Sequence, residues 1–450
     1  MICRAVRDHY RCPEGFLTFE LNDDLCGQPG YFRFGSDVTC YGRSCFASSA
    51  LNSSLYDAIA DTGLRNGKLG LPFDPTEVIE NLRQERYSNG DGGGYSDLAK
   101  KAYYFARPLT NAFVRKQMQR FHMRKWRQRQ FPQWPVDTTV ESIGERLLLM
   151  SLQTSGAREI PFVWFWPRGA SGCVIMTHDV ETAAGMNFCP ALIDIDKSFG
   201  IRASIQIVPE SRYVVPADFM NSARERGLEL CVQDLNHDGR LFDDRKEFLR
   251  RVARINRYGA EWGAKGFRSA VLYRKPEWFE DLQFSYDMSM PNVAHLDPQH
   301  GGCCTVMPYF IGKILELPVT TVQDYMLFHL LNERSIDLWK TQIELILQKN
   351  GLVSFIVHPD YLISEDTRKV YVDLLRYLRK LEQNMPLWFT LPREVDSWWR
   401  ARSQMEVVKE DDSWRIEGAG SELAVLAFAK NVGGKLVYEL AESRRGVSSV

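Results

Sequence analysis

The sequence predicts an α/β protein built around a parallel barrel or a doubly wound sheet. Between about residues 158 and 400, short runs rich in β-branched and aromatic residues alternate with amphipathic helical segments. Repeated strand–helix alternation is typical of a parallel sheet covered by helices. Several of the apolar runs end in acidic, basic or histidine residues. The carboxyl ends of parallel strands are where α/β proteins place their chemistry.

The expected strands are short apolar runs spread along this region. They are residues 161–166, 173–179, 203–209, 228–233, 266–271, 313–319 and 352–358. Helical segments with charged outer faces lie between some of these runs, at residues 218–227, 243–263, 335–351 and 366–384. Arginine and lysine alternate there with apolar positions, which is the pattern of helices that pack one face against a sheet.

Residues 1–155 are predicted to form a separate mixed α and β region of unknown role. Residues 30–45 are expected to form a short hairpin, and residues 73–87 a helix that begins at Asp74-Pro75-Thr76. Residues 88–97 are rich in glycine and serine and are the best candidate for a linker. A basic, aromatic helical stretch follows at residues 101–134. We expect it to pack on its own protein rather than on a nucleic acid or a membrane surface.

The barrel domain is expected to span residues 156–400, and residues 401–450 a small β-unit. Strand-like runs between Met405 and Leu440 are separated by turns at Asp411-Asp412 and Asn431 to Gly434. This spacing predicts an antiparallel unit. Covering an open face of the main domain is its simplest role.

Composition excludes several classes of function. The chain has 450 residues with a net charge of −1, so it offers no bulk attraction for a nucleic acid or an anionic membrane. No apolar run reaches the length of about 18 residues that a membrane span needs. The N-terminus lacks the apolar core of a signal peptide, which predicts a cytoplasmic location. The ten cysteines match no common zinc spacing and are expected to be mostly reduced thiols. The sequence does not predict an oligomeric state.

Five stretches at the predicted strand ends carry the polar residues of a candidate site. Asp179 and Glu181 share one face of a strand because side chains alternate along it, with His178 on the other face. Carboxylates, imidazoles and an arginine together are the inventory of metal-assisted hydrolysis. The full set is Asp179, Glu181, Gln233, Asp234, His237, Asp238, Arg268, Asp324, His358 and Asp360.

The order of these five motifs resembles that of the polysaccharide deacetylases, the NodB-type carbohydrate esterases. The resemblance covers about residues 165–400. It implies an irregular parallel (β/α) barrel, one divalent metal ion and removal of N- or O-acetyl groups from sugars. Zinc is the expected metal, with cobalt, nickel or manganese as alternatives, and a carbohydrate is the expected substrate.

The resemblance also implies a role for each residue of the first motifs. Asp179 would be the general base that activates the attacking water, and Arg268 would hold it. Glu181 and His237 would be metal ligands. Gln233 falls where the family has the first histidine of an HxxxH pair, so it takes the third ligand position.

The later motifs would supply the acid side of the reaction. His358 would protonate the leaving group, Asp324 would lie near the base as an orienting acid, and Asp360 would orient His358. The loop at residues 285–304 would shape specificity. Candidates for substrate contacts are Asp287, Asn292, His295, His300 and Asp360.

Gln233 leaves alternatives open at the metal site. A neutral amide oxygen is a poor zinc ligand, so the set would suit a harder ion better. Asp234 or His295 would be substitute ligands. If the metal is lost, the chain is a non-catalytic carbohydrate-binding pseudoenzyme. A hydrolase of a non-sugar, non-peptide C–N bond would share every motif.

Overall fold

The computed structural model describes residues 3–22, 24–52, 54–65, 68–89, 131–294, 301–411 and 413–441. The chain divides into two compact units. The first comprises residues 1–90, 139–170 and 397–450, and the second comprises residues 91–138 and 171–396. Most of the predicted linker and basic stretch, together with His295 and His300, lies outside the described residues.

The second unit is built on a nine-stranded sheet, ordered β12-β13-β11-β10-β9-β8-β7-β14, with β15 paired to β7. Its strands are β7 (Gly172–Val180), β8 (Ala203–Ile207), β9 (Glu229–Gln233), β10 (Gly266–Arg268), β11 (Tyr286–Asp287), β12 (Tyr309–Ile311), β13 (Ile314–Glu316), β14 (Leu352–Val357) and β15 (Leu387–Thr390). All pairs are parallel except β12 with β13. The predicted parallel α/β class is confirmed as a curled half-barrel.

The curl brings strands that are far apart in the sheet order within reach of one another. Arg268 on β10 contacts Asp179 on β7, although β8 and β9 lie between these strands in the order. The segment after β13 is joined by side-chain hydrogen bonds to β14, at the other edge of the sheet. The hydroxyl of Thr320 donates to the Leu352 carbonyl, and that of Thr321 donates to the Ser354 carbonyl, both at 2.7 Å.

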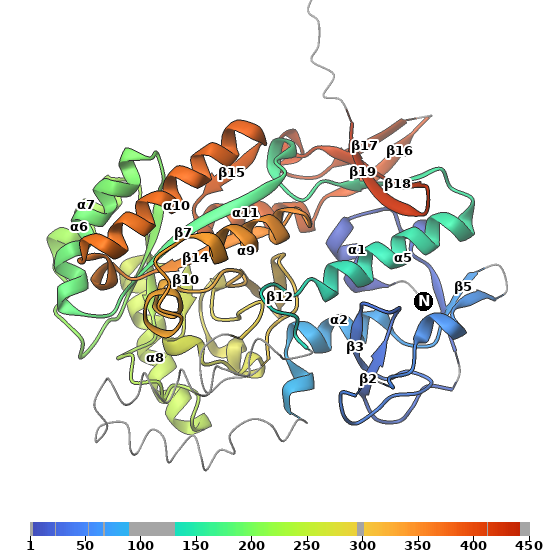
Figure 1. Ribbon diagram of the computed structural model, residues 1–450, viewed down its shortest axis with the longest axis horizontal. Coiled ribbons are helices and arrows are strands. Elements are labelled where there is room, and N and C mark those ends of the chain that lie inside the picture. The colour runs from blue at the N-terminus through green and yellow to red at the C-terminus, as the bar shows by residue number, and fades with distance from the viewer. Residues whose placement is uncertain are drawn as a thin grey trace, which may run out of the picture. The chain divides into compact units, whose positions relative to one another are not determined.

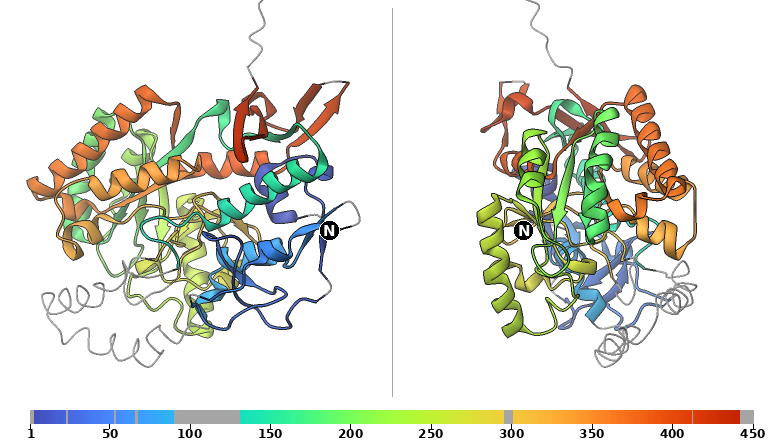
Figure 2. Two further views of the ribbon diagram at one scale, coloured as in Figure 1. Left: turned by 45° about the vertical axis from the view of Figure 1, so that its right-hand side comes forward. Right: turned by 90° about the vertical axis from the view of Figure 1, so that its left-hand side faces the viewer.

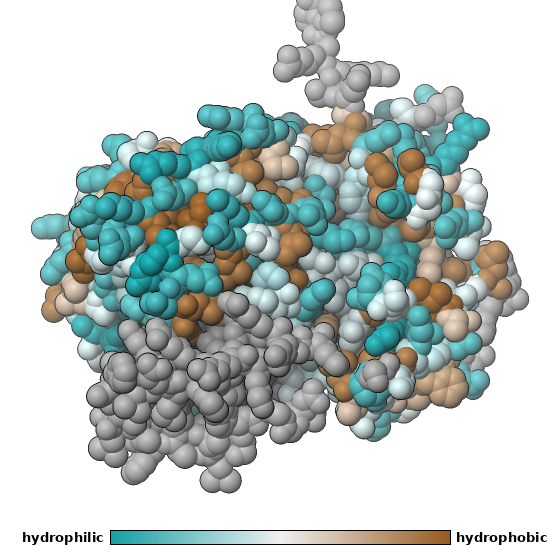
Figure 3. Space-filling view, viewed as in Figure 1, coloured by the Kyte–Doolittle hydropathy of each residue, from teal (hydrophilic) through white to brown (hydrophobic). Residues whose placement is uncertain are grey.

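Helices of this unit lie along the outer surface of the sheet, as the two views of Figure 2 show. They are α6 (Ala183–Ser198), α7 (Ala217–Glu225), α8 (Arg245–Trp262), α9 (Asp337–Leu347) and α10 (Glu365–Asn384). Figure 1 shows α9 and α10 running beside β7 and β14. α10 buries Val370, Tyr371, Leu374 and Leu378 on one face. In Figure 3 its outer face is mainly hydrophilic, as the charged positions of the sequence predict.

One predicted strand of the barrel belongs elsewhere. Residues 161–166 were expected in the parallel sheet, but β6 (Glu159–Val163) lies in the first unit and pairs with β18. A short, continuous apolar run shows that a strand is buried, but it does not identify the strand's partner. The expectation was wrong for that reason.

The described part of the first unit contains four small sheets, ordered β1-β5-β4, β2-β3, β16-β17 and β19-β18-β6. The strands are β1 (Phe19–Leu21), β2 (Gly30–Arg33), β3 (Thr39–Gly42), β4 (Gly63–Arg65), β5 (Lys68–Leu71), β16 (Glu406–Glu410), β17 (Ser413–Glu417), β18 (Leu426–Val432) and β19 (Lys435–Leu440). The helices are α1 (Arg4–Tyr10), α2 (Pro75–Arg83), α5 (Thr139–Ser155) and the second half of α11 (Pro392–Ser403). The predicted C-terminal strands are confirmed as antiparallel pairs.

A buried arginine ties the pieces of this unit together. Arg402, at 1% exposure, donates to the backbone carbonyls of His9, Val163 and Trp164 at 2.6–3.0 Å. A guanidinium can bridge several acceptors at once because its donors form a rigid planar fork. In the described ranges, none of the helices combines the length and the apolar composition needed to cross a lipid bilayer.

The buried Glu229 makes the stability of the second unit depend on pH. Its carboxyl is 3% exposed and accepts from the Tyr286 hydroxyl at 2.6 Å and from the Arg393 amide at 3.0 Å. Burial raises its pKa to about 7, against an ordinary value of 4.5, although these two donors oppose the shift. Between these two values the folded chain holds a proton that the unfolded chain has lost, so stability falls as pH rises through this window.

We predict that Glu229→Gln removes this pH dependence. At pH 8 the variant should gain on the order of 3 kcal/mol over the unsubstituted chain, and near pH 4 the two should be alike. Urea midpoints of unfolding measured from pH 4 to 8 provide the check. Glu261→Gln, at an exposed position on α8, is the control and should leave the profile unchanged. Parallel pH profiles for Glu229→Gln and the unsubstituted chain would contradict the prediction.

Candidate functional site

A buried ion pair between Asp179 and Arg268 forms the base of the candidate site. Asp179 is near the carboxyl end of β7 and Arg268 is the last residue of β10. Arg268 Nη1 donates to Asp179 Oδ1 at 2.5 Å and to the Thr177 hydroxyl at 2.8 Å. Its Nε donates to the Met288 carbonyl at 3.1 Å. Thr177 and Asp179 therefore share the inner face of β7, as their spacing predicted.

Glu181 is surrounded by nitrogen atoms from three segments. Its Oε1 lies 2.8 Å from His237 Nε2, 3.1 Å from Gln233 Nε2 and 3.4 Å from His358 Nε2. Gln233 Nε2 also donates to Asp179 Oδ2 at 3.1 Å. One amide group thus bridges the two carboxylates, in the space between them.

The loop after β9 carries His237 in a left-handed backbone conformation. Asp234 has φ 51° and His237 has φ 54°. Aspartate and histidine are among the non-glycine residues that tolerate this region best. The loop is held by the Asp234 amide, which donates to the Arg268 carbonyl at 2.8 Å, and by the Arg251–Asp238 ion pair at 2.7 Å. These contacts direct His237 toward Glu181.

His358 follows β14 and is anchored by Asp324. Asp324 Oδ1 lies 2.6 Å from His358 Nδ1, and its Oδ2 accepts from the His358 amide at 2.7 Å. Nδ1 carries a proton because it faces a carboxylate. The other ring nitrogen, Nε2, is turned toward Glu181. The acid that orients this imidazole is Asp324, whereas the sequence pointed to Asp360.

Burial and the neighbouring charges shift the pKa values of these groups in opposite directions. Burial raises the pKa of Asp179, and the Arg268 guanidinium opposes that rise. Burial acts in the same sense on Glu181, but His237 and His358 outweigh it and hold its pKa well below the usual range. Burial lowers the pKa of His358, but Asp324 and Glu181 outweigh it and raise the pKa well above 6.5. The shifts favour the carboxylate form of Glu181 and the protonated imidazole form of His358.

Seven of the residues predicted from the sequence meet in one cluster. Asp179, Glu181, Gln233, His237, Arg268, Asp324 and His358 are joined by the contacts given above. Asp287 is fully buried and accepts from the Ser289 amide and hydroxyl, both at 2.8 Å. His295 lies outside the described residues. Asp360 is partly buried, and its Oδ1 has no hydrogen-bond partner among the described residues.

A second polar network lies on the other face of β7, and the sequence did not indicate it. His178 Nε2 lies 2.6 Å from Asp196 Oδ2, and the Tyr371 hydroxyl donates to Asp196 Oδ1 at 2.5 Å. It ties β7 to α6 and α10, directly behind the site. The alternation of side chains along the strand placed His178 on the opposite face from Asp179. The partners of His178 come from α6 and α10, and the periodicity of a helix does not show which strand residue it will contact.

The site residues fit the divalent cation that the motifs imply. His237 Nε2 lies 2.8 Å from Glu181 Oε1, so an imidazole nitrogen and a carboxylate oxygen face the same point. Both groups are ligands that divalent cations accept in proteins. Asp179, Glu181 and His358 also present one ligand atom each, all within 4.8 Å of one another. Carboxylate and imidazole donors of this kind suit zinc or a harder first-row ion.

Gln233 contributes to this fit only after its amide rotates. Facing two carboxylates, the amide turns its nitrogen toward them, and a nitrogen that donates hydrogen bonds does not bind a cation. Its Oε1 is buried and has no partner among the described residues. A half-turn about the last side-chain bond would exchange the two atoms and direct the oxygen toward Glu181.

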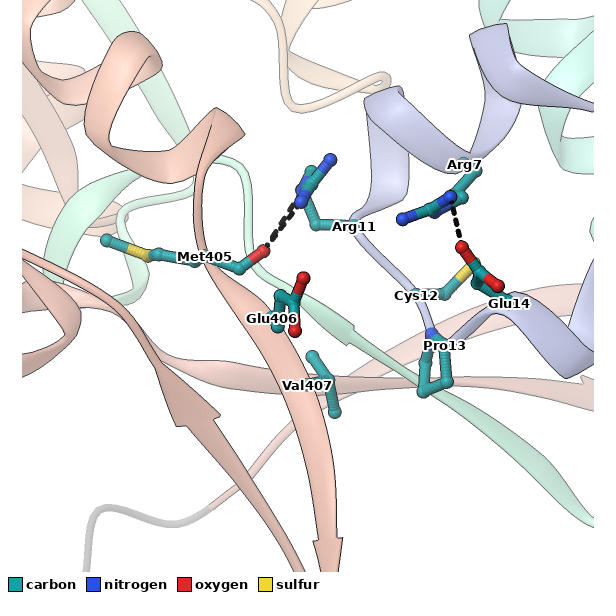
Figure 4. A pocket seen from close by; sticks show the side chains of 8 residues that line it. All are labelled: Arg7, Arg11, Cys12, Pro13, Glu14, Met405, Glu406 and Val407. Carbon is teal, nitrogen blue, oxygen red and sulfur yellow. Dashed lines mark hydrogen bonds and ion pairs between the residues drawn. The ribbon is translucent and has the colours of Figure 1, made fainter.

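A separate hollow of about 270 Å³ lies within the first unit (Figure 4). Its arginines are already engaged. Arg7 pairs with Glu14 at 2.6 Å, and Arg11 donates to the Met405 carbonyl at 2.8 and 3.1 Å. Carboxylates of Glu14 and Glu406 line it too. The hollow therefore lacks the excess positive charge of an anion site.

Comparison with known proteins returns structural matches only. No protein-family model matches the chain, and the curated proteins contain no match. Similar solved structures include a protein from Mycobacterium smegmatis assigned as a polysaccharide deacetylase (15% identity, 56% of this chain, 98% of that chain, TM-score 0.44). A PuuE allantoinase (14%, 52%, 92%, TM-score 0.42) and an acetyl xylan esterase from Clostridium thermocellum (11%, 50%, 91%, TM-score 0.33) are also similar.

The structures found thus include polysaccharide deacetylases, the family that the motifs resemble.

We predict that Arg268→Met destabilises the protein by about 3–5 kcal/mol, because it leaves Asp179 as a buried charge without its cation. The double variant Arg268→Met, Asp179→Asn should regain part of that loss. Arg202→Met, which removes an exposed partner of Glu394, is the control and should cost less than about 1 kcal/mol. Urea unfolding of all variants provides the measurement. Equal losses for Arg268→Met and Arg202→Met would contradict the central role of the buried pair.

Proposed function

We propose that the chain is a metal-dependent hydrolase that removes an acetyl group from an N-acetylated or O-acetylated sugar. The observation that carries the proposal is the convergence of three pairs at the strand ends of the second unit. Asp179 pairs with Arg268, Glu181 with His237, and His358 with Asp324. Hydrolysis of an amide or ester needs a base, an electrophile and an acid. The first and third pairs would supply the base and the acid, and the second would hold the cation that serves as the electrophile.

Asp179 supplies the base. Arg268 occupies its Oδ1, so Oδ2 is the oxygen that would take the proton from the attacking water. Among the described residues, Oδ2 accepts from the neutral Gln233 amide. The buried guanidinium holds the Asp179 carboxylate in one orientation, so the base does not have to reorient during the reaction.

His358 supplies the acid. Asp324 holds its Nδ1 and its backbone amide, which leaves the proton on Nε2 for the nitrogen or oxygen of the leaving group. Placed at Glu181 and His237, a divalent cation would supply a Lewis acid for the acetyl carbonyl and the attacking water. Glu181 lies between the base and the acid, within 3.4 Å of His358 Nε2.

A second candidate function, sugar binding without catalysis, is favoured by one observation. The Gln233 amide already links Asp179 and Glu181, so the carboxylates are partly compensated in the absence of a cation. A protein that never binds metal would be stable in this arrangement. Metal uptake by the purified chain separates the two functions, since only the hydrolase requires it.

We predict acetate release from N-acetylated or O-acetylated sugars in the presence of zinc, cobalt, nickel or manganese, and loss of release with a chelator. Asp179→Asn should lower the rate by about 100-fold or more, because general-base catalysis contributes at least that factor. Asp194→Asn, at an exposed position on α6, is the control and should retain the full rate. Absence of acetate with every metal across a broad panel of sugars would contradict the proposal.

We predict that Gln233→His raises the affinity for zinc by at least about tenfold, because an imidazole is a stronger zinc ligand than an amide. Competition with a chromophoric chelator measures this without reference to activity. Gln404→His, on the surface of the first unit, is the control. Equal zinc affinity in Gln233→His and the unsubstituted chain would show that residue 233 does not face the metal. A cation bound only by Gln233→His would support the second candidate.

A further inference from the structure

Two buried carboxyl groups lie side by side in the second unit, apart from the residues that form the candidate site. Asp287 on β11 and Glu316 on β13 are register neighbours in a parallel pair of strands, and both side chains are fully buried. Neighbouring strands are about 4.8 Å apart, so two side chains at one register position are within contact distance. Burying two carboxylates this close together is costly, because like charges repel and neither is hydrated. The pair therefore needs a proton between them.

The pair lies on the reverse face of the sheet from the candidate site. Asp287 is the register neighbour of Phe267 on β10, and Phe267 belongs to a hydrophobic cluster with Phe284 and Ile314. Successive side chains of a strand point to opposite faces, so the next residue, Arg268, is directed to the other side. An influence of the pair on the site therefore has to pass through the backbone between them.

The hydrogen bonds around the pair identify Glu316 as the protonated partner. Asp287 accepts from the Ser289 amide and from the Ser289 hydroxyl, both at 2.8 Å, as a carboxylate does. Glu316 Oε1 accepts from the Met290 amide at 3.0 Å, whereas its Oε2 is buried and receives no donor among the described residues. A proton on Oε2 satisfies that atom by donating to Asp287, which is within hydrogen-bond reach of Glu316.

The charges around the pair favour the same assignment. Burial raises the pKa of Glu316 well above its ordinary value of 4.5, and the Asp287 carboxylate adds to the rise. Burial also raises the pKa of Asp287, but its hydrogen bonds and the Arg268 charge oppose that rise. Two further groups face the pair. The Arg274 charge opposes the rise at Glu316, and Tyr309 is the register neighbour of Glu316 on β12.

The segment that Asp287 binds also holds Arg268. The Ser289 hydroxyl, which donates to Asp287, accepts from the Ser269 amide at 2.9 Å, and Ser269 directly follows Arg268. From the same segment, the Met288 carbonyl accepts from Arg268 Nε at 3.1 Å. Both the backbone next to Arg268 and its guanidinium are therefore fixed by the residues that follow β11.

We propose that Glu316 stays a neutral carboxylic acid in the folded protein and that, together with Asp287, it positions Arg268. The acid donates its proton to Asp287, so one buried negative charge remains in place of two. That charge fixes the segment after β11, and the segment directs the Arg268 guanidinium toward Asp179. Glu316 and Asp287 are positioning residues, because they act through Arg268. The effect on a catalytic base rests on the proposed function, whereas the proton and the hold on Arg268 do not.

Infrared spectroscopy tests the proton directly. At about pH 8.5 ordinary carboxyls are ionised, and so is Glu229 with its pKa of about 7. The C=O stretching band of a protonated carboxyl should nevertheless remain, and Glu316→Gln should remove it. Glu229→Gln, at another buried glutamate of the same sheet, is the matched control and should leave the band unchanged. Absence of the band from the unsubstituted chain, or its persistence in Glu316→Gln, would overturn the neutral acid.

Exchange of the Arg268 Nε proton with water tests the positioning without turnover. Nitrogen-15 spectra show this N–H group, and its signal is identified by its loss in Arg268→Lys. Glu316→Ala should speed the exchange by about tenfold or more, because a hydrogen bond to a charged group contributes at least that factor. Glu316→Gln should keep the exchange slow, since its amide can donate to Asp287 and accept from Met290. Unchanged exchange in Glu316→Ala, or fast exchange in Glu316→Gln, would overturn the positioning role.

A second variant tests the same connection while both carboxyls stay in place. Ser289→Ala removes the hydroxyl that links Asp287 to the Ser269 amide, so it should also speed the exchange at Arg268. Ser354→Ala, at a buried serine of β14 in the same sheet, is the matched control and should leave the exchange slow. Equal exchange in these two variants would count against the connection. Thermal melts check that each variant is folded.

Acetate release measured on the same proteins separates this inference from the proposed function. In an active hydrolase Glu316→Ala should lower kcat by about tenfold or more and leave KM unchanged, because a displaced base slows the reaction without weakening binding. Glu316→Gln should restore kcat. Arg268 exchange that depends on Glu316, without any acetate release, would support the positioning role and contradict the hydrolase. Acetate release with an unchanged kcat in Glu316→Ala would do the reverse.

Discussion

The arrangement of the second unit depends on keeping two buried carboxylates charged side by side. Asp179 and Glu181 project from the end of one strand, and burying an uncompensated carboxylate costs several kcal/mol. Arg268, His237, His358 and the Gln233 amide supply the compensation from other segments. These partners sit at or after the carboxyl ends of β9, β10 and β14. The curled sheet is what brings them together.

The partners are themselves held by groups behind them. Arg268 is fixed by the Met288 carbonyl, and His358 by Asp324. On the far side of β7, His178 and Asp196 tie the strand to the helices that cover it. An acid–base site works only when its groups hold their geometry, and here rigid strands and buried hydrogen bonds provide that.

Gln233 bears on the metal requirement of the proposed chemistry. The Gln233 amide donates to both carboxylates and compensates them without a cation. In the proposed metal site it would also weaken the preference for zinc.

The sequence by itself determined the parallel α/β class, the inner face of β7 and the residues at its strand ends, because side-chain alternation and strand–helix succession are local properties. It did not determine which acid contacts His358 or the unit to which β6 belongs. Those depend on contacts between segments 30 or more residues apart, such as Asp324 with His358 and β6 with β18. Only the tertiary structure decides such pairings, because strand edges and carboxylates accept many partners until packing selects one.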